Sequence, residues 1–259
     1  MKISVKKYEK KLYDWWYKKG KKKKSSIHSI PKLYNITLKT IKFYEKQLEL
    51  SCTNKIVLEY GCGSGSYAFY LAKNGAHVIG IDISSEGIKE AQEKAKELDL
   101  SNIQFYVMDA EQLGFNYNSF DIICGTGILH HLNLSKSLNE INKILKKNGS
   151  VIFLEPMGQN PFLSLLRKII PHVRTKDEHP LTYKDLKLID NYFQHTRFEF
   201  FHLFSIFAIF FRNFFIFKYI LDVLVKFDKL IAKCIPPLKL LSWQIVLILN
   251  KPKKKQILI

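Results

Sequence analysis

The sequence is poor in the residues that build covalent or metal-held frameworks. Its four cysteines, Cys52, Cys62, Cys124 and Cys234, lie far apart, with no CxxC pair and no histidine at metal-ligand spacing. This distribution argues against a disulfide framework and a zinc site. We therefore expect reduced thiols, as in a cytosolic protein, and no metal.

Long apolar segments are also missing. No stretch reaches the roughly 18 consecutive apolar residues that a membrane-spanning helix needs, and the N-terminus lacks the apolar core of a signal peptide. The nearest candidate, Leu203 to Phe211, is followed by Arg212. With 47% hydrophobic residues the chain can still bury a sizeable core. We expect a cytoplasmic protein, with peripheral contact to the inner membrane face left open.

Positive charge is concentrated at the two ends of the chain. The formal net charge is +18; residues 1–24 hold 11 Lys against two acidic residues, and residues 251–255 hold four more Lys. Only +5 remains for residues 25–250. Basic tails suit an anionic lipid surface or nucleic acid, but solubility or a lysine-rich proteome explains them equally well.

Three zones follow one another along the chain: a basic, helical N-terminal extension (1–50), a regular core (51–155) and an aromatic C-terminal part (156–259). In the core, short β-branched runs alternate with longer helical patterns. The pattern predicts strands at 56–58, 77–81, 104–107, 121–124 and 151–154, and helices at 33–50, 67–73, 84–98 and 134–145. Such alternation is typical of βαβ units and a parallel sheet covered on both faces.

A glycine-rich turn stands at the end of the first expected strand. Gly61, Gly63 and Gly65 follow Glu59, and a turn between strand and helix lies at the edge of the sheet where open α/β folds bind ligands. Dinucleotide enzymes have a similar loop, but their third glycine would stand at Ser66. No Gly-Lys-Ser/Thr follows, which excludes a P-loop. Glu59 suits a ligand with a positive amino group rather than a pyrophosphate.

Three further features follow in order. Asp82 ends the second strand, where a carboxylate can accept hydrogen bonds from two ribose hydroxyls. Asp109 follows the third strand and can accept from an adenine amino group. The run 120–124 then leads into His130 and His131. Taken alone, Asp82 could be a helix N-terminal carboxylate, Asp109 a loop carboxylate, and one histidine a packed structural residue.

Together these motifs resemble the core of class I S-adenosylmethionine-dependent methyltransferases, in the small-molecule branch that includes enzymes of quinone biosynthesis. The resemblance covers residues 55–155. It implies a Rossmann-like, doubly wound, mostly parallel seven-stranded sheet with an antiparallel final strand, for which 243–249 is the candidate.

The resemblance also implies roles for individual residues around S-adenosylmethionine. The three loop glycines would lie under its methionine part, with Glu59 near the amino group and Gly125 to Gly127 along the same side. Asp82 would hold the ribose and Ile83 would pack against the adenine. Asp109 and Ala110 would face the adenine edge.

A general base is needed only if the acceptor is a hydroxyl or an acidic carbon. The candidates are His131, Glu155, His179 and Tyr17. Segments 155–161 and 174–181 follow the fifth strand and are expected to cap the acceptor side, although their charges could simply satisfy one another.

Residues 198–234 contain eleven phenylalanines. Between 213 and 233, polar residues recur at helical spacing on one face, which predicts an amphipathic helix inserted before the last strand. Such a helix can lie in a membrane interface with its lysines toward anionic headgroups, or it can cover the sheet or form a subunit contact.

Three hypotheses remain open. The first is an enzyme that methylates a small or lipid-like acceptor, at a membrane surface. The second is a nucleic-acid methyltransferase whose basic tails bind phosphates, although no amino-methylating Asn/Asp-Pro-Pro-aromatic motif is present. The third is a non-catalytic interaction protein, against which the intact glycine loop argues. The acceptor and the oligomeric state are not determined by the sequence.

Overall fold

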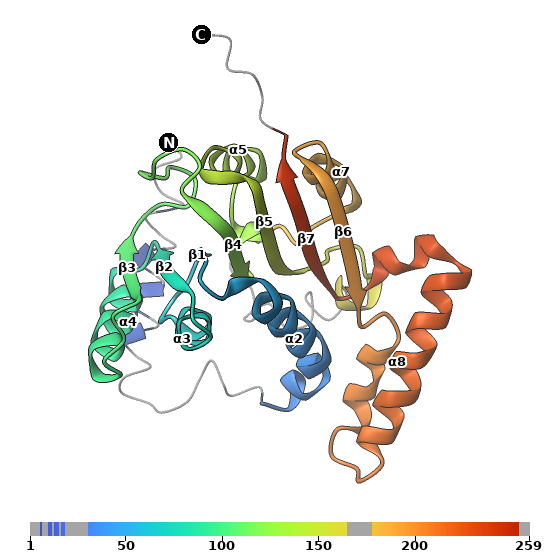
Figure 1. The fold of residues 1–259 in the computed structure, drawn as a ribbon. Helices are drawn as coiled ribbons and strands as arrows, with labels where there is room; N and C mark the ends of the chain where they lie inside the picture. Colours follow the sequence, from blue (N-terminus) through green and yellow to red (C-terminus); the bar gives the residue numbers. More distant parts are fainter. Residues whose placement is uncertain are drawn as a thin grey trace.

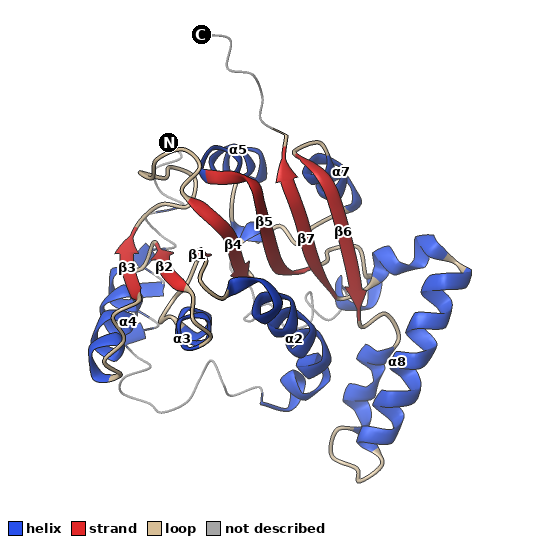
Figure 2. Cartoon of the chain, in the orientation of Figure 1, coloured by secondary structure: helices blue, strands red, loops and turns tan. Residues whose placement is uncertain are grey.

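A seven-stranded sheet forms the centre of the protein in the computed structural model (Figures 1 and 2). The structure describes residues 6, 10, 11, 13–15, 17, 18, 31–164 and 178–253. The strand order is β3-β2-β1-β4-β5-β7-β6. The strands are β1 (Ile56–Tyr60), β2 (His77–Asp82), β3 (Ile103–Val107), β4 (Phe120–Thr126), β5 (Leu145–Pro156), β6 (Phe193–Phe201) and β7 (Gln244–Pro252).

Strands β1 to β5 are parallel, and β7 runs antiparallel to both of its neighbours, β5 and β6. The antiparallel final strand expected from the resemblance is therefore confirmed. The runs at β1 and β4 are buried because helices cover both of their faces, as the continuous apolar sequence of parallel strands requires.

Helices form a layer on each face of the sheet. One layer contains α2 (Pro31–Cys52), α3 (Ser66–Lys73) and α4 (Ser85–Glu97); the other contains η2 (Leu129–His131), α5 (Leu134–Ile144) and α7 (Tyr183–Asp190). Two apolar cores lie between these layers and the sheet. Tyr44, Leu71 and Ile88 belong to the first, and Leu138, Ile141 and Ile189 to the second.

The predicted core elements are confirmed with small changes at their ends, except that β5 begins at Leu145, six residues before the predicted strand. The C-terminal part also contains β6, a strand that the sequence pattern did not predict. Residues 198–201 belong to it and not to the helical insertion. Only Phe193 in β6 is fully buried, and the outer residues are exposed or half-buried. An edge strand of this kind lacks the buried run that marks β1 or β4.

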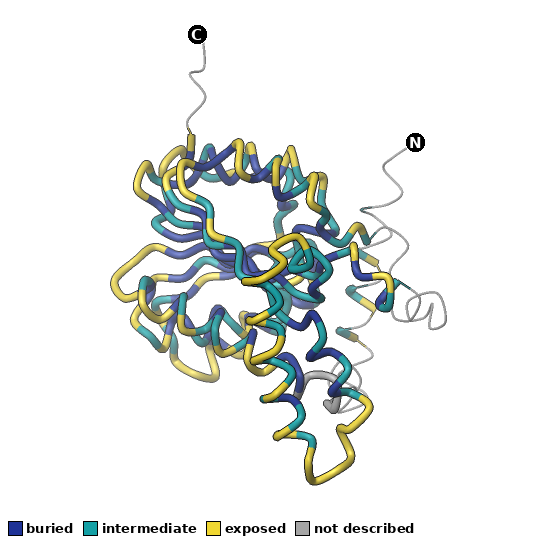
Figure 3. Tube along the Cα trace, turned by 90° about the vertical axis from the view of Figure 1, so that its right-hand side faces the viewer, coloured by how far each residue is buried: buried dark blue, intermediate teal, exposed yellow. Residues whose placement is uncertain are grey.

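Residues 203–241, here called the aromatic hairpin, project from the edge of the sheet beside β6 (Figures 1 and 3). They contain η4 (Ser205–Phe211), α8 (Phe217–Cys234) and η5 (Pro236–Leu241). The Asp228 carboxylate of α8 accepts backbone hydrogen bonds at the start of η4, including one of 2.6 Å from Phe204. Ile36, Ala208 and Leu221 join the hairpin to α2. The predicted amphipathic helix is confirmed as α8. No helix in the described part of the chain is long and apolar enough to cross a bilayer.

Candidate functional site

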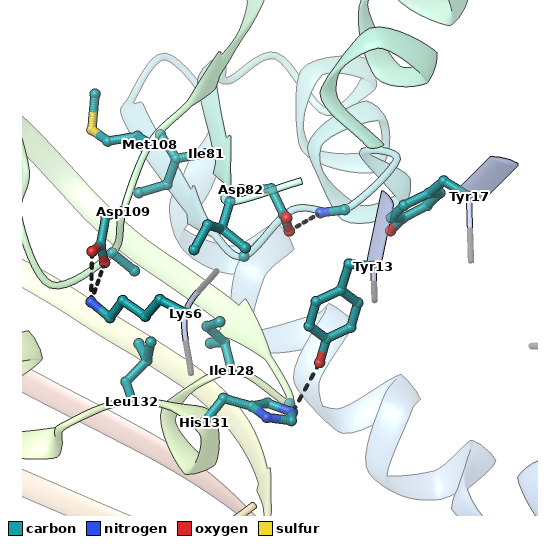
Figure 4. Close-up of a pocket in the computed structure, with 15 residues that line it drawn as sticks. Lys6, Tyr13, Tyr17, Ile81, Asp82, Met108, Asp109, Ile128, His131 and Leu132 are labelled. Atoms are coloured by element: carbon teal, nitrogen blue, oxygen red, sulfur yellow. Dashed lines mark hydrogen bonds and ion pairs between the residues drawn. The ribbon is translucent and has the colours of Figure 1, made fainter. Parts of the chain in front are cut away.

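A pocket opens at the carboxyl ends of β1, β2, β3 and β4, under the described N-terminal residues (Figure 4). This is the edge at which open α/β sheets bind ligands. The residues that line it are Lys6, Tyr13, Tyr17, Gly61, Gly63, Ile81, Asp82, Ile83, Met108, Asp109, Ala110, Gly127, Ile128, His131 and Leu132.

The glycine turn after β1 forms one wall of this pocket. Gly61 and Gly63 have φ angles of +70° and +54°, a region that residues with a Cβ rarely adopt. A Cβ at Gly61 would lie 2.8 Å from the side chain of Ile128, and one at Gly63 would overlap the hydroxyl of Tyr17. The loop therefore presents bare backbone to the pocket. A side chain at either position would occupy space that a ligand could use.

Asp82 stands beside this turn and holds it in place. Its two oxygens accept 2.8 Å hydrogen bonds from the amides of Gly63 and Ser84 (Figure 4). Burial raises the pKa of the Asp82 carboxyl, and the bonds from Ser84 and Gly63 oppose that rise. Each oxygen has a second lone pair, so the carboxylate can also accept from two hydroxyls in the pocket.

Asp109 lies across the pocket from the glycine turn. It accepts two hydrogen bonds from the ammonium of Lys6, at 2.7 and 2.6 Å, and one of 2.8 Å from the amide of Glu111. Lys6 thus holds the acceptor oxygens that the sequence predicts for an adenine amino group. Ile83 and Met108, which also line the pocket, supply apolar surface for a flat ring.

The described residues between 6 and 18 are helical and cover the pocket. Asp14 anchors them, because its carboxylate accepts from the Ser84 hydroxyl at 2.7 Å and from the Glu86 amide at 3.1 Å, at the N-terminus of α4. Burial raises the pKa of Tyr17, so at neutral pH this phenol is protonated and is a poor candidate for a general base.

His131 ends η2, on the loop that follows β4. One ring nitrogen, Nε2, lies 3.4 Å from the Tyr13 hydroxyl, and the two rings meet edge to face. The side chain lines the pocket, as a residue that handles the acceptor would have to do. Among the four base candidates, His131 and Tyr17 line the pocket.

Glu155 and His179 do not line it. The Glu155 carboxylate is buried and accepts from the amides of Ile128 and Leu129 at 2.9 and 2.8 Å and bonds to His130 Nδ1 at 2.8 Å. It therefore fixes the loop that carries the histidine pair. His179 is exposed, and its backbone amide donates to the His130 carbonyl.

Three of the predicted cofactor residues also lie behind the pocket surface. Gly65 and Gly125 support the turn and β4 from within the fold. A Cβ at Gly125 would lie 2.6 Å from the Tyr60 carbonyl oxygen. Glu59 is only 4% exposed and points into the layer of α2 and α3. Burial raises its pKa to about 8, which leaves it uncharged at neutral pH. Direct contact of these three with a ligand stays a prediction.

Lys6, Tyr13, Ile128 and Leu132 line the pocket and were not proposed from the sequence. Lys6 and Tyr13 belong to the basic, helical N-terminal extension, from which only Tyr17 was proposed as a site residue. One signal was available: Asp14 is an isolated acidic residue between aromatic residues in a lysine-rich stretch.

The pocket offers the groups that S-adenosylmethionine needs. Bare backbone at Gly61 and Gly63 would lie under the methionine part, and carboxylates stand where the ribose and the adenine amino group each need acceptors. Apolar walls lie between the two carboxylates.

The methyltransferase-domain family matches residues 52–194. The ubiquinone biosynthesis O-methyltransferase of Coxiella burnetii is 33% identical over 147 residues, which are 57% of this chain and 58% of the relative. Aklanonic acid methyltransferase of a Streptomyces species is 38% identical over 118 residues, 43% of this chain and 54% of the relative. The chain thus spans less than two thirds of these curated relatives.

Solved structures extend the likeness to most of the chain at the level of fold. Geranyl diphosphate C-methyltransferase from Streptomyces coelicolor, crystallised with S-adenosyl-L-homocysteine, has a TM-score of 0.58 and 14% identity, and the match covers 81% of this chain and 74% of that one. A sarcosine dimethylglycine methyltransferase from Galdieria sulphuraria has a TM-score of 0.57 and 17% identity, with 84% and 86% covered. The expected fold class is confirmed.

Proposed function

Because this chain belongs to the methyltransferase-domain family, we propose that it transfers the methyl group of S-adenosylmethionine to an oxygen of a small, lipid-like acceptor at a membrane surface. The observation that supports S-adenosylmethionine as the donor is the pairing of the bare glycine turn with Asp82. S-adenosylmethionine brings an already activated methyl group, so the protein has to hold donor and acceptor in line. Orientation of this kind can supply about 7–11 kcal/mol of the barrier.

Asp82 would bind both ribose hydroxyls through its outward lone pairs, while its inward bonds to Gly63 and Ser84 keep it rigid. Asp109 would accept from the adenine amino group after Lys6 moves aside. The described residues between 6 and 18 would then exclude water from the bound donor.

The relatives named ubiquinone biosynthesis O-methyltransferase support an oxygen acceptor on a molecule of quinone type. A hydroxyl has to lose its proton as it attacks. Asp82 and Asp109 would hold the donor, which leaves His131 as the pocket-lining group that would lie beside the acceptor oxygen.

The aromatic hairpin supports the membrane part of the proposal. Phe215 is 98% exposed, Tyr219 is 74% exposed and Phe210 is 64% exposed. Exposed lysines accompany them on α8, at positions 218, 226, 229 and 233. Each lysine near an anionic leaflet contributes about 1 kcal/mol of attraction, and each buried aromatic ring about 1.5–3 kcal/mol. Figure 3 shows this exposed end standing away from the sheet.

The donor half is tested by calorimetry with S-adenosylmethionine. Asp82→Asn should weaken binding roughly 10- to 100-fold, because hydrogen bonds to a charged acceptor contribute about 1.5–3 kcal/mol. Asp99→Asn, the same change in the exposed turn after α4, is the matched control and should leave affinity unchanged. Equal affinities for the two variants would rule out Asp82 as the ribose ligand.

The membrane half is tested by flotation with vesicles of phosphatidylglycerol and phosphatidylethanolamine, and with neutral phosphatidylcholine vesicles. The double variant Phe215→Ser, Tyr219→Ser should have an affinity for the anionic vesicles that is lower by at least about tenfold. Tyr117→Ser, which changes a 59% exposed ring on the loop before β4, is the control. The lysines at positions 19, 21–24, 254 and 255, which the sequence predicts as membrane or nucleic-acid contacts, lie outside the described part of the chain. Salt-sensitive binding to RNA without binding to vesicles would favour a nucleic-acid acceptor instead.

A further inference from the structure

Three metal-ligating side chains converge at the edge of the pocket. His130, His131 and Glu178 each offer one ligand atom, a ring nitrogen or a carboxylate oxygen, and these atoms lie within 4.8 Å of one another. The two imidazole rings have their centroids 4.1 Å apart and are tilted by 39°. His130 is buried, and the other two side chains are half-buried, so the cluster lies at the border between core and solvent.

Both sides of the cluster are held by the fold. Glu155 bonds to His130 Nδ1 and to the amides of Ile128 and Leu129, so the ring of His130 is fixed and its Nε2 is left for another partner. A carboxylate on the far nitrogen of a histidine is the usual support of a metal-binding imidazole.

The segment that carries Glu178 is tied to the same loop. The amide of His179 donates to the carbonyl of His130 at 2.8 Å, and Leu181 forms a bridge with Met157 at the end of β5. Glu178 is therefore placed beside the histidines by the backbone contacts of His179 and Leu181, which follow it in the chain. The sequence did not indicate this grouping because its members come from segments that are distant in the chain.

We propose that His130, His131 and Glu178 bind a divalent transition-metal cation such as Zn²⁺. Around a tetrahedral cation with metal–ligand bonds of about 2.1 Å, ligand atoms lie about 3.4 Å apart, so the cluster, whose atoms lie within 4.8 Å of one another, has to contract by up to about 1.4 Å to close on a cation. Two imidazoles and one carboxylate suit Zn²⁺, Co²⁺ or Fe²⁺ better than Mg²⁺, which prefers oxygen ligands. Three protein ligands leave positions open for water or a further ligand.

The place of the cluster indicates what that open position would bind. His131 also lines the pocket, where its ring lies beside Tyr13 (Figure 4). A cation here would lie where the oxygen of an acceptor approaches. Because a bound cation stabilises the deprotonated form of an oxygen ligand, it would assist attack without a separate base.

This role toward the acceptor rests on the proposed function, whereas binding of the cation does not. The acceptor's O–H proton leaves to water, the resulting oxygen anion forms a bond to the methyl carbon, and the carbon–sulfur bond breaks with its electron pair kept by sulfur. The products are a methyl ether, a neutral thioether and one proton. In this arrangement His131 is a metal ligand and does not itself take the proton.

The test is a cation titration of the full chain after dialysis against a chelator, with neither methyl donor nor acceptor present. Zn²⁺ binding is measured by calorimetry, and Co²⁺ binding by the visible absorption that a nitrogen-ligated cobalt ion acquires. We expect one site per chain, and Mg²⁺ should not compete for it. Glu178→Gln and His131→Gln should each weaken binding at least about 10- to 100-fold. His179→Asn, an exposed histidine next to the cluster, is the matched control and should bind like the unchanged protein.

Folding of each variant is checked by urea unfolding. An unchanged protein that binds the methyl donor but no Zn²⁺ or Co²⁺ would overturn the metal site and leave the proposed function standing. Equal cation affinity in Glu178→Gln and His179→Asn would overturn the ligand assignment. Loss of donor binding with an intact cation isotherm would instead contradict the proposed function.

Discussion

Glu59 is a buried carboxyl group whose ionisation should destabilise the fold. It is 4% exposed, and in the described structure its Oε2 has no hydrogen-bond partner. Burial is the main reason why its pKa rises from 4.5 to about 8, with a smaller opposing effect from the amide of Ala68. The group is therefore protonated in the folded protein at neutral pH and ionised in the unfolded chain.

The sign and the size of the effect follow from linkage. Below about pH 4.5 both states hold the proton, and the free energy of unfolding does not depend on this group. Between about pH 4.5 and 8 the folded state alone keeps the proton, so the free energy of unfolding falls as the pH rises. At about 1.4 kcal/mol for each pH unit, the loss approaches 5 kcal/mol over the whole window and is about 3 kcal/mol at pH 7.

Glu59→Gln should remove most of this dependence. Urea unfolding at about pH 5 and pH 8 gives the free energy of unfolding for both proteins, and the variant should gain a few kcal/mol over the parent on going from the lower to the higher pH. Glu97→Gln makes the same chemical change at an exposed position and serves as the control. Parallel pH profiles for the parent and Glu59→Gln would refute the assignment of an uncharged, buried Glu59.

Two further predictions concern buried positions. Gly125→Ala should lower stability by about 1–3 kcal/mol in urea unfolding, because the new Cβ would lie 2.6 Å from the Tyr60 carbonyl oxygen and 2.6 Å from the Phe153 ring; an unchanged midpoint would contradict this packing. Burial lowers the pKa of His202 from 6.5 to about 4. As the pH falls through that window the unfolded chain takes up a proton that the folded protein does not, so the free energy of unfolding should fall by about 3 kcal/mol. His202→Asn, which tolerates the φ of +64° there, should flatten the acid limb of the stability profile, and an unaltered limb would exclude His202 as its cause.

The donor side of the site could be predicted from the sequence because its residues lie at the ends of neighbouring strands that the sequence pattern locates. Buried apolar runs mark β1 and β4, and the largely apolar run of β2 ends directly at Asp82. The parallel sheet then brings the ends of β1 and β2 together, and the 2.8 Å bond from Gly63 to Asp82 results from that register. Periodicity and turn chemistry were sufficient for this part.

Other contacts depend on chain segments that meet only after folding. Nothing in the composition of residues 1–24 distinguishes Lys6 from its neighbouring lysines, yet its ammonium binds Asp109. The role of Glu155 shows the same limit from the other direction. Its position at the end of β5 made it a candidate base, but in the structure it binds the loop that carries His130.

The proposed acceptor side is built from such distant contacts. The sequence around the glycine turn therefore predicts how the donor is held but does not predict the acceptor. His131 reaches the pocket only because Glu155 fixes the preceding loop, and Glu178 reaches His131 only because the chain returns from beyond β5 to pair with that loop. On the proposed function, a change of acceptor would therefore require changes in the returning segment, with the strands of the core left as they are. Because the donor-binding strand ends and the acceptor-binding segments have separate supports in the fold, variants at Glu178 should alter acceptor use while their affinity for S-adenosylmethionine stays close to that of the unchanged protein.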